Sequence, residues 1–155
     1  MSKNTKNKYY GNFFLCNKLD KGLTKVEGLY DTIVLDDPQE TVNLKIPVFL
    51  NSTIEESEEV AFLFILRMLS KEVNDVYLPL VFRNRKLEKG DLFMEASVWN
   101  YSNATFPQCG TYSIELYVHG GTLKTDGMDK EQFTDILNKS DLLNRYLLHV
   151  DYKNK

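Results

Sequence analysis

The most apolar stretch of the chain runs from Glu59 to Leu69 and reads EVAFLFILRML. Successive side chains of a strand point to opposite faces of a sheet. Here both alternating sets are apolar: Val60, Phe62, Phe64, Leu66 and Met68 on one side, and Ala61, Leu63, Ile65 and Leu69 on the other. A strand with two apolar faces is buried on both of them. We therefore predict a central strand that other elements cover from both sides.

A helix over residues 54–72 is the alternative for the same stretch. Thr53 is a candidate N-cap, glutamates follow it, and Arg67 and Lys71 stand near the end, an order that suits the helix dipole. Against the helix, about ten residues that are apolar all round would need cover on every side. Val, Phe and Ile are also among the weaker helix formers, so the strand is favoured.

The composition is that of a globular domain rich in strand formers. The 155 residues are 43% hydrophobic and include nine Phe, nine Tyr and one Trp, whereas alanine is scarce. A chain of this length can bury about two-thirds of its unfolded surface. We expect residues 1–8 to form a flexible basic tail and residues 9–155 to form a single, mainly β domain.

Charge and hydropathy exclude several classes of partner. The net charge is −3 and the pI is about 5.4, whereas nucleic acid is bound through clustered Lys and Arg. No apolar run reaches the length of a membrane span, and no apolar signal core follows the basic N-terminus. We expect a cytoplasmic protein without nucleic-acid or membrane partners. Cys16 and Cys109 lack a CxxC partner, and we expect both to be small buried side chains.

Period-two patterns and turn residues predict strands along most of the chain, over residues 10–16, 23–35, 41–50, 76–82, 92–101, 111–119 and 146–152. Pro47 and Pro79 each remove a ladder donor, which favours an edge position or a bulge. Residues 83–90 have the composition of a polar turn, and Gly120-Gly121 that of a hairpin turn. Between residues 125 and 143 the spacing becomes helical, which predicts a short helix near residues 129–138. About eight strands and one helix are typical of a β-sandwich.

Two segments resemble a known family. Residues 22–31 (GLTKVEGLYD) and residues 107–118 (PQCGTYSIELYV) are similar to an early and a late strand of small immunoglobulin-like β-sandwich proteins of unknown function from bacteria and their phages. The similarity covers about residues 13–121, and residues 122–144 depart from it as an insertion that carries the predicted helix. The resemblance implies a two-sheet, immunoglobulin-like sandwich with one short helix before the last strand. It brings no catalytic residue to this chain.

The sequence holds no pattern of a catalytic, metal or nucleotide site. The two histidines, His119 and His149, have no second metal ligand nearby in the sequence. A Gly-x-Ser-x-Gly elbow and a phosphate loop are both missing from the sequence. We therefore expect neither an enzyme nor a metal or cofactor, although a catalytic triad can also be assembled in space.

The segment 98–106 is the first candidate for binding. It combines Trp99, Tyr101 and Phe106 with small polar residues, a composition typical of recognition surfaces carried by loops. The alternative is that Trp99 fills the core of the sandwich. In that case Tyr101, which is in the same phase of the strand, is directed inward as well.

Arg83, Arg85 and Lys86 are the second candidate, because they form the compact basic cluster of the chain. Such a cluster can contact a phosphate or an acidic protein surface. More often, a turn of this kind is a solvated hairpin that protects a sheet edge.

Together, these observations favour a non-catalytic protein-binding module that acts through loops or through a free sheet edge. The resemblance adds the role of a phage or mobile-element accessory protein that binds or inhibits a host protein. The alternatives are a sandwich that binds a carbohydrate or small ligand, with Trp99 and Tyr101 as a stacking platform, and then an enzyme of unrecognised type. The sequence leaves the oligomeric state open, a homo-oligomer included.

Overall fold

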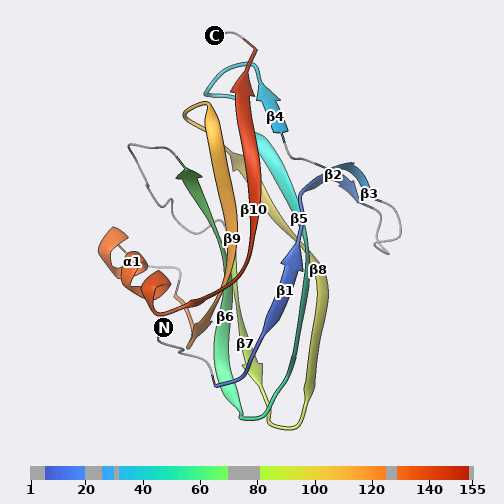
Figure 1. Ribbon diagram of the computed structural model, residues 1–155, viewed down its shortest axis with the longest axis vertical. Helices are drawn as coiled ribbons and strands as arrows, with labels where there is room; N and C mark the ends of the chain where they lie inside the picture. Colours follow the sequence, from blue (N-terminus) through green and yellow to red (C-terminus); the bar gives the residue numbers. More distant parts are fainter. Residues whose placement is uncertain (1–5, 20–25, 30–31, 70–80, 125–128, 154–155) are drawn as a thin grey trace.

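The computed structural model is a two-sheet β-sandwich with one helix (Figure 1). It describes residues 6–19, 26–29, 32–69, 81–124 and 129–153. Their elements are β1 (Tyr10–Phe13), β2 (Cys16–Leu19), β3 (Val26–Leu29), β4 (Thr32–Leu35), β5 (Val42–Thr53), β6 (Glu58–Leu69), β7 (Val81–Leu87), β8 (Leu92–Ala104), β9 (Gly110–Gly120), α1 (Lys130–Asn138) and β10 (Asp141–Tyr152). The first sheet contains β1, β2, β3, β5 and β8, and the second has the order β4-β10-β9-β6-β7. The predicted mainly β sandwich, with a helix before the last strand, is confirmed.

The stretch at residues 59–69 is strand β6, as predicted. It lies between β9 and β7 in the second sheet and is antiparallel to both. Phe62 and Phe64 are fully buried between the two sheets. Leu63 and Ile65, which point to the opposite face, are fully buried in a second apolar cluster beneath the helix. Both faces are therefore covered, which decides against a helix at residues 54–72.

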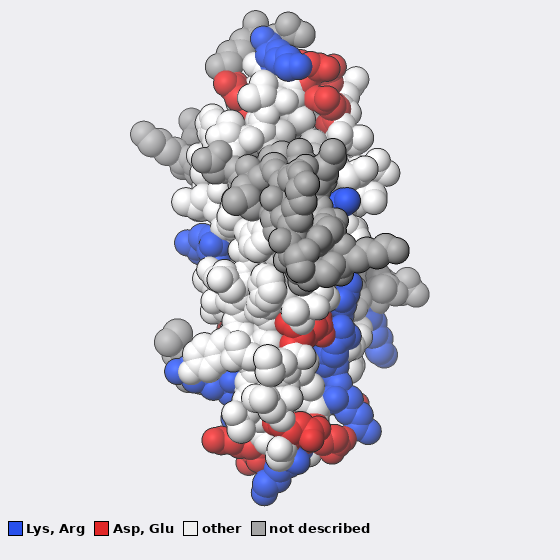
Figure 2. All heavy atoms as spheres, turned by 90° about the vertical axis from the view of Figure 1, so that its right-hand side faces the viewer, with Lys and Arg blue, Asp and Glu red and all other residues white. Residues whose placement is uncertain are grey.

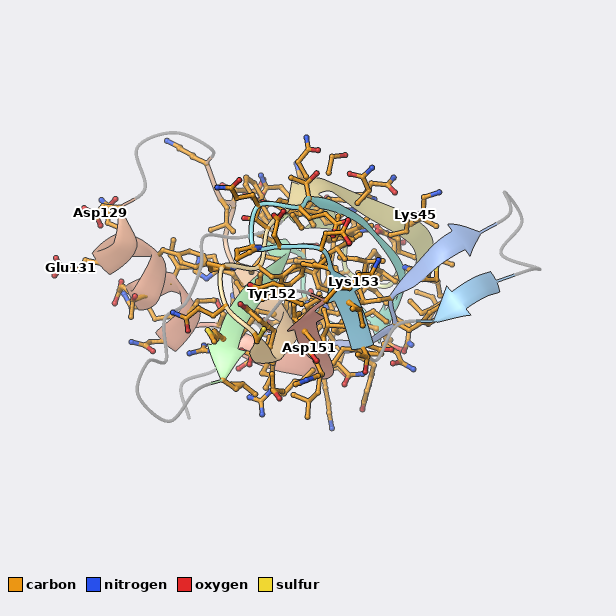
Figure 3. The ribbon with its side chains drawn as sticks, turned by 90° about the horizontal axis from the view of Figure 1, so that it is seen from above. Lys45, Asp129, Glu131, Asp151, Tyr152 and Lys153 are labelled. Carbon is orange, nitrogen blue, oxygen red and sulfur yellow. The ribbon has the colours of Figure 1, made fainter. Side chains whose placement is uncertain are left out.

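Helix α1 covers the outer face of the second sheet, and its position near residues 129–138 is as predicted. Asp129 and Gln132 form a capping box, in which the Asp129 carboxylate accepts from the Gln132 N–H at 2.7 Å. Phe133 and Leu137 pack on the outward-facing apolar residues of β6. Figure 3 shows α1, whose start is labelled at Asp129 and Glu131, on the opposite side of the sandwich from β2 and β3.

Strand β5 is an interior strand, and its register with β8 is unbroken at Pro47, so Pro47 marks neither the edge position nor the bulge that was expected. Strand β5 pairs with β8 on one side and with β1 and then β2 on the other. The Phe14 N–H donates to the Pro47 carbonyl at 3.4 Å, so the backbone of Pro47 faces β1 and β2. Pro47 lies opposite the break between these two strands, between Val48, which pairs with β1, and Lys45, which pairs with β2. The missing donor therefore falls where the ladder is interrupted.

The N-terminal third of the chain changes sheets, which the sequence did not predict. Residues 10–16 belong to two strands, β1 and β2, instead of one. Residues 23–35 contain β3, which pairs with β2 in the first sheet, and β4, which runs parallel to β10 in the second. Residues 20–25 and 30–31 lie outside the described residues. The prediction of one strand over residues 23–35 is wrong. Side chains alternate with a period of two in the strands of both sheets, so the sequence pattern does not show to which sheet a strand belongs.

Two further expectations need correction, and a third is mostly untested. Residues 83–87 continue strand β7, so only residues 88–91 form the turn that was expected at 83–90. An edge strand tolerates charged side chains, and its composition therefore resembles that of a turn. Gly120-Gly121 does not join two strands of a tight hairpin, because α1 intervenes before β10 returns to pair with β9. Pro79 and most of the strand predicted at 76–82 lie outside the described residues.

The loop before β9 contains a tyrosine corner. The hydroxyl of buried Tyr112 donates to the Gln108 carbonyl at 2.7 Å and accepts from the Gln108 N–H at 3.3 Å. A tyrosine near the start of a strand that bonds back to the loop before it is a hallmark of immunoglobulin-like sandwiches. The adjacency of β6, β9 and β10 in the second sheet matches the C-F-G sheet of that architecture.

The ordered domain includes at least part of the segment expected to be a tail. Asn7 is buried, and its side-chain oxygen accepts from the N–H groups of Glu55 and Glu56 at 2.7 and 3.0 Å. Its side-chain amide donates to the Glu56 carbonyl at 2.8 Å and also to Glu58. The Tyr9 hydroxyl donates to the Glu58 carboxylate at 2.8 Å. Asn7 thus ties the start of the chain to the turn between β5 and β6.

Candidate interaction surface

Trp99 lies on β8 with its side chain between the two sheets, where it is fully buried. Its Nε1–H donates to Ser97 Oγ at 2.9 Å. Its ring meets Phe64 edge-on at 5.0 Å between centroids, and the Arg83 guanidinium lies 4.6 Å from the ring centre. A buried indole offers no surface to a partner or a sugar. Trp99 therefore fills the core, and the binding role predicted for it is corrected.

The other two aromatic residues of the segment 98–106 also serve the core. Phe106 is fully buried and packs edge-on against Tyr112 at 5.1 Å. The Tyr152 hydroxyl donates to its carbonyl oxygen. Tyr101 is half-buried against the same core cluster, as expected if it points the same way as Trp99. The binding role predicted for Phe106 is therefore corrected as well.

The side chains of Arg83 and Arg85 are on the face of β7 that points toward the first sheet. There they contact Glu95 of β8. Arg85 Nε donates to Glu95 Oε1 at 2.9 Å, and Arg83 Nη1 lies 3.8 Å from Glu95 Oε2. Ser97 Oγ also donates to this carboxylate, at 2.9 Å. Burial acts to raise the pKa of Glu95, but these hydrogen bonds and the two guanidinium charges outweigh it, so the pKa lies below its ordinary 4.5. Both arginines are thus occupied within the fold.

Lys86 is the member of the predicted basic cluster that is exposed. It lies opposite Glu59 on β6, in the phase of β7 that points away from the inter-sheet core. Its neighbour Asn84 points the same way and bonds both backbone groups of Leu123, at 2.9 and 3.0 Å. The three basic residues therefore do not act together, because the alternation of the strand separates Lys86 from Arg83 and Arg85.

The first sheet exposes apolar side chains that the sequence reasoning did not single out. Relative exposure is 52% for Tyr10, 39% for Phe49, 67% for Leu92 and 72% for Met94. All four lie on the side of the sheet that faces away from the second sheet. We call this surface the outer apolar face and define it by Tyr10, Phe49, Leu92, Met94, Ala96 and Val98.

The strand register places the residues of the outer apolar face at neighbouring positions, with the polar Asn51 between Tyr10 and Met94. Tyr10 of β1 is opposite Asn51 of β5, which is opposite Met94 of β8, and Phe49 is opposite Ala96. Side chains of paired residues stand on the same face of a sheet and touch their neighbours. Scattered exposed apolar residues are ordinary, but a contiguous group marks an interaction site.

The outer apolar face carries few charges. Neither the outward-facing residues of β8 from Leu92 to Val98 nor those of β5 from Phe49 to Thr53 include a charged side chain. Lys8 lies at the margin, with its Nζ 5.3 Å from the centre of the Tyr10 ring. In Figure 2, which views the molecule from the right-hand side of Figure 1, white atoms make up much of the lower half, with charged side chains at both margins and at the lower end. The sequence contained an indication of this face, because both alternating sets of residues 92–99 include apolar side chains.

The second sheet contains a buried ionic cluster centred on Glu115 of β9, whose side chain is fully buried. Oε1 accepts from the Tyr117 hydroxyl at 2.8 Å and from Arg67 Nε at 3.4 Å. Oε2 accepts from Ser113 Oγ at 2.6 Å and from Arg145 Nε at 3.2 Å. Burial acts to raise the pKa of Glu115, but these donors and charges outweigh it, and the pKa lies below its ordinary 4.5. The carboxylate is fully bonded, which suits a structural cross-link of β6, β9 and β10.

The two histidines lie apart. His119 is near the end of β9, with its Nδ1 3.2 Å from Ser140 Oγ, and burial together with the nearby Lys139 charge lowers its pKa. His149 is exposed on β10 and pairs with Thr111, at the opposite end of β9. Across the described ranges, no group of three His, Cys, Asp or Glu side chains is arranged to hold a metal ion.

One of the two cysteines differs from expectation. Cys16 is buried, as predicted, whereas Cys109 is exposed in the loop before β9. Its Sγ lies 3.7 Å from Asp151 Oδ1 near the end of β10. Within the part of the chain that the structure describes, no helix has the length and apolar character needed to cross a membrane.

Comparisons with known proteins give distant structural likenesses. No family model and no curated protein matches the sequence. A β-glucosidase from Listeria innocua aligns with a TM-score of 0.48 and 8% identity in its isofagomine complex, over 94% of this chain and 16% of the glucosidase chain. Its gluconolactone complex gives 0.49 and 8%, over 96% and 17%. PapD-like domain 7 of human CEP192 gives 0.27 and 14%, over 81% and 83%. At these values, the likenesses say nothing about activity or partners.

Proposed function

We propose that the protein is a non-catalytic protein-binding module whose binding surface is the outer apolar face. The observation that carries this proposal is the exposure of Tyr10, Phe49, Leu92 and Met94 at neighbouring positions on one sheet face. Leaving such side chains in water costs about 25 cal/mol for each Å² of apolar surface. A partner that covers them recovers this free energy.

The composition of the face also supports a protein partner. The centre of a protein interface is depleted in charged residues and enriched in aromatic residues and methionine, and its rim is polar. The outer apolar face has Phe49 and Met94 near its centre, with Lys8 and Thr53 at its margin. Methionine side chains adapt their shape to a partner.

The other functions expected from the sequence have less support. A stacking platform for a carbohydrate would need an exposed Trp99, which is buried. The role of an accessory protein that binds or inhibits a host protein is compatible with the proposed surface, and it stays a prediction.

The test compares two double variants with matched exposure. Tyr10→Glu with Phe49→Glu places two charges on the outer apolar face. Val34→Glu with Leu147→Glu is the control, because these residues are 54% and 55% exposed and lie on the second sheet. Binding partners are captured from lysate of the encoding organism with the wild-type protein. The dissociation constant of each purified partner is then measured for all three proteins by calorimetry.

We expect the outer-face variant to bind about 100-fold more weakly, because two buried contacts of more than about 1 kcal/mol each are replaced by buried charges. The control variant should bind like the wild-type protein. A partner that binds the outer-face variant and the wild-type protein equally well would refute the proposed surface.

A further inference from the structure

Among the described strands, β8 has β5 on one side and no strand on the other, which leaves an empty place beside it. In a constant-type immunoglobulin sandwich, one sheet contains the strands A, B, E and D, so that strand E has a neighbour on both sides. Here β1, β5 and β8 occupy the places of A, B and E, and β7 leads to β8 through residues 88–91 alone. This connection is too short to contain a strand D. In Figure 1, the lower half of β8 lies along the right margin, with no strand beyond it.

The register identifies the backbone groups that face this empty place. The Pro47 carbonyl faces β1 and β2, because it accepts from the Phe14 N–H, and Pro47 is opposite Val98. Pro47 and Val98 are therefore a non-hydrogen-bonded pair, and the N–H and C=O groups of Val98 face away from β5. By alternation, the same holds for Met94, Ala96 and Asn100. No hydrogen bond from the described residues reaches these groups.

The middle of this edge lacks the usual protection against strand pairing. Edges are blunted by lysine, proline, inward-pointing charges or bulges. Glu95 points inward, but Arg85 and Arg83 already neutralise it. A bulge with Asn103 at φ 61° interrupts the strand only beyond Tyr101. Residues 96–101 of β8 thus form an uncharged, regular edge.

We propose that a second copy of the chain fills the empty place, with the two β8 strands antiparallel about a two-fold axis at Ala96. This register sets Ala96 opposite Ala96 of the second copy, Met94 opposite Val98, and Leu92 opposite Asn100. All of these residues have free backbone groups that point toward the partner strand, so every pair can exchange two hydrogen bonds. The same patch serves both copies, as a two-fold interface requires.

Two features select this register over one centred on Val98. A centre at Val98 would set Met94 opposite Ser102, inside the bulge, whereas a centre at Ala96 leaves the bulge outside the paired region. On the inward side, the Ala96 register sets Glu95 opposite Ser97 of the second copy. Within one chain the Ser97 hydroxyl already donates to the Glu95 carboxylate at 2.9 Å. The Ser97 hydroxyl of the second copy is a donor of the same kind for this carboxylate.

The dimer is independent of the proposed function. Pairing at the edge leaves the outer apolar face uncovered and joins the faces of both copies into one longer surface. An interface formed by one strand pair is at the small end of stable contacts, so we expect a dissociation constant of about 1–10 µM.

The experiment uses opposite charges at the two-fold axis. Wild-type protein, Ala96→Lys and Ala96→Glu are examined by sedimentation velocity at about 100 µM, roughly tenfold above the weakest expected dissociation constant. We expect a wild-type dimer and a dissociation constant up to about fivefold higher for each single variant, because like charges then face each other across the strand pair. The equimolar mixture should regain the wild-type value, because the lysine introduced in one copy then faces the glutamate introduced in the other. Ala96→Pro, which removes one outward N–H and leaves the pairing with β5 intact, should be a monomer with an unchanged circular dichroism spectrum.

Three results would overturn the proposal: a monomeric wild-type protein at this concentration, single charge variants that dimerise as strongly as the wild-type protein, or a mixture that dimerises no more strongly than the single variants. Failure of the proposed function is distinguishable from these results. The Tyr10→Glu, Phe49→Glu variant alters β1 and β5, so it should remain dimeric whether or not it binds a partner protein.

Discussion

Replacing Trp99 by alanine tests whether the two sheets are held together at the contact between β8 and β6. The substitution removes a fully buried indole. It also removes the bond to Ser97 at 2.9 Å, the edge-on contact with Phe64 at 5.0 Å and the contact with Arg83 at 4.6 Å. The Ser97 hydroxyl keeps its bond to Glu95, so no buried polar group loses its last partner.

The expected loss follows from these contacts. Truncation of a buried tryptophan to alanine costs about 3–5 kcal/mol, which includes the cavity that remains. The upper half of this range applies, because the lost hydrogen bond contributes about 1 kcal/mol and the ring contact about 0.5–1.5 kcal/mol. A loss of about 4 kcal/mol lowers the midpoint of thermal unfolding by about 8–16 °C for a domain of this size. Trp99→Phe keeps a ring and should lose only about 1–2 kcal/mol.

The assay is urea unfolding followed by far-ultraviolet circular dichroism, because the variants lack the single Trp as a fluorescence probe. Leu147→Ala on β10 is the control, because this residue lies outside both the outer apolar face and the edge of β8. Its side chain is 55% exposed, and surface substitutions usually change stability by less than about 0.5 kcal/mol. A loss below about 1.5 kcal/mol for Trp99→Ala would refute the placement of this ring in the core.

Other predictions concern polar groups. The folded-state pKa values of Glu95 and Glu115 lie below 4.5, so their stabilisation is present above pH 4.5 and is lost as the pH falls through the folded-state values. The double variant Glu95→Gln, Glu115→Gln should lose less unfolding free energy than the wild-type protein as the pH falls below 4.5. Equal slopes for the two proteins would contradict this. Asn7→Ala should lose about 2–3 kcal/mol in urea unfolding, because it removes three hydrogen bonds to the backbone of Glu55 and Glu56, each worth about 1 kcal/mol; an unchanged midpoint would show that these bonds are not needed. Tyr112→Phe should lower the free energy of unfolding by about 1–1.5 kcal/mol, because it removes the hydrogen bond to Gln108. Thermal unfolding measures this, and no loss would show that the tyrosine corner does not stabilise the fold.

Several elements could be predicted from the sequence because their signals are local. The two apolar phases of residues 59–69 required cover on both faces, and the structure provides it with the first sheet on one side and α1 on the other. The capping residues Asp129 and Gln132 lie three positions apart, so the start of α1 was readable as well.

The candidate site could not be predicted in the same way. Arg83, Arg85 and Lys86 form one cluster in the sequence, but strand alternation directs the two arginines inward to Glu95 and leaves the lysine exposed. Trp99 had two consistent interpretations until β8 was placed over β6. The outer apolar face was overlooked because its residues come from β1, β5 and β8, which are far apart in the chain.

Local sequence patterns were therefore sufficient for the class of the fold, the central strand and the helix, because burial and capping act over a few neighbouring residues. The sheet to which each N-terminal strand belongs, the burial of Trp99 and the free edge of β8 became known only from the three-dimensional arrangement. These features depend on which strands pair, and pairing joins segments whose separation in the chain leaves no local pattern.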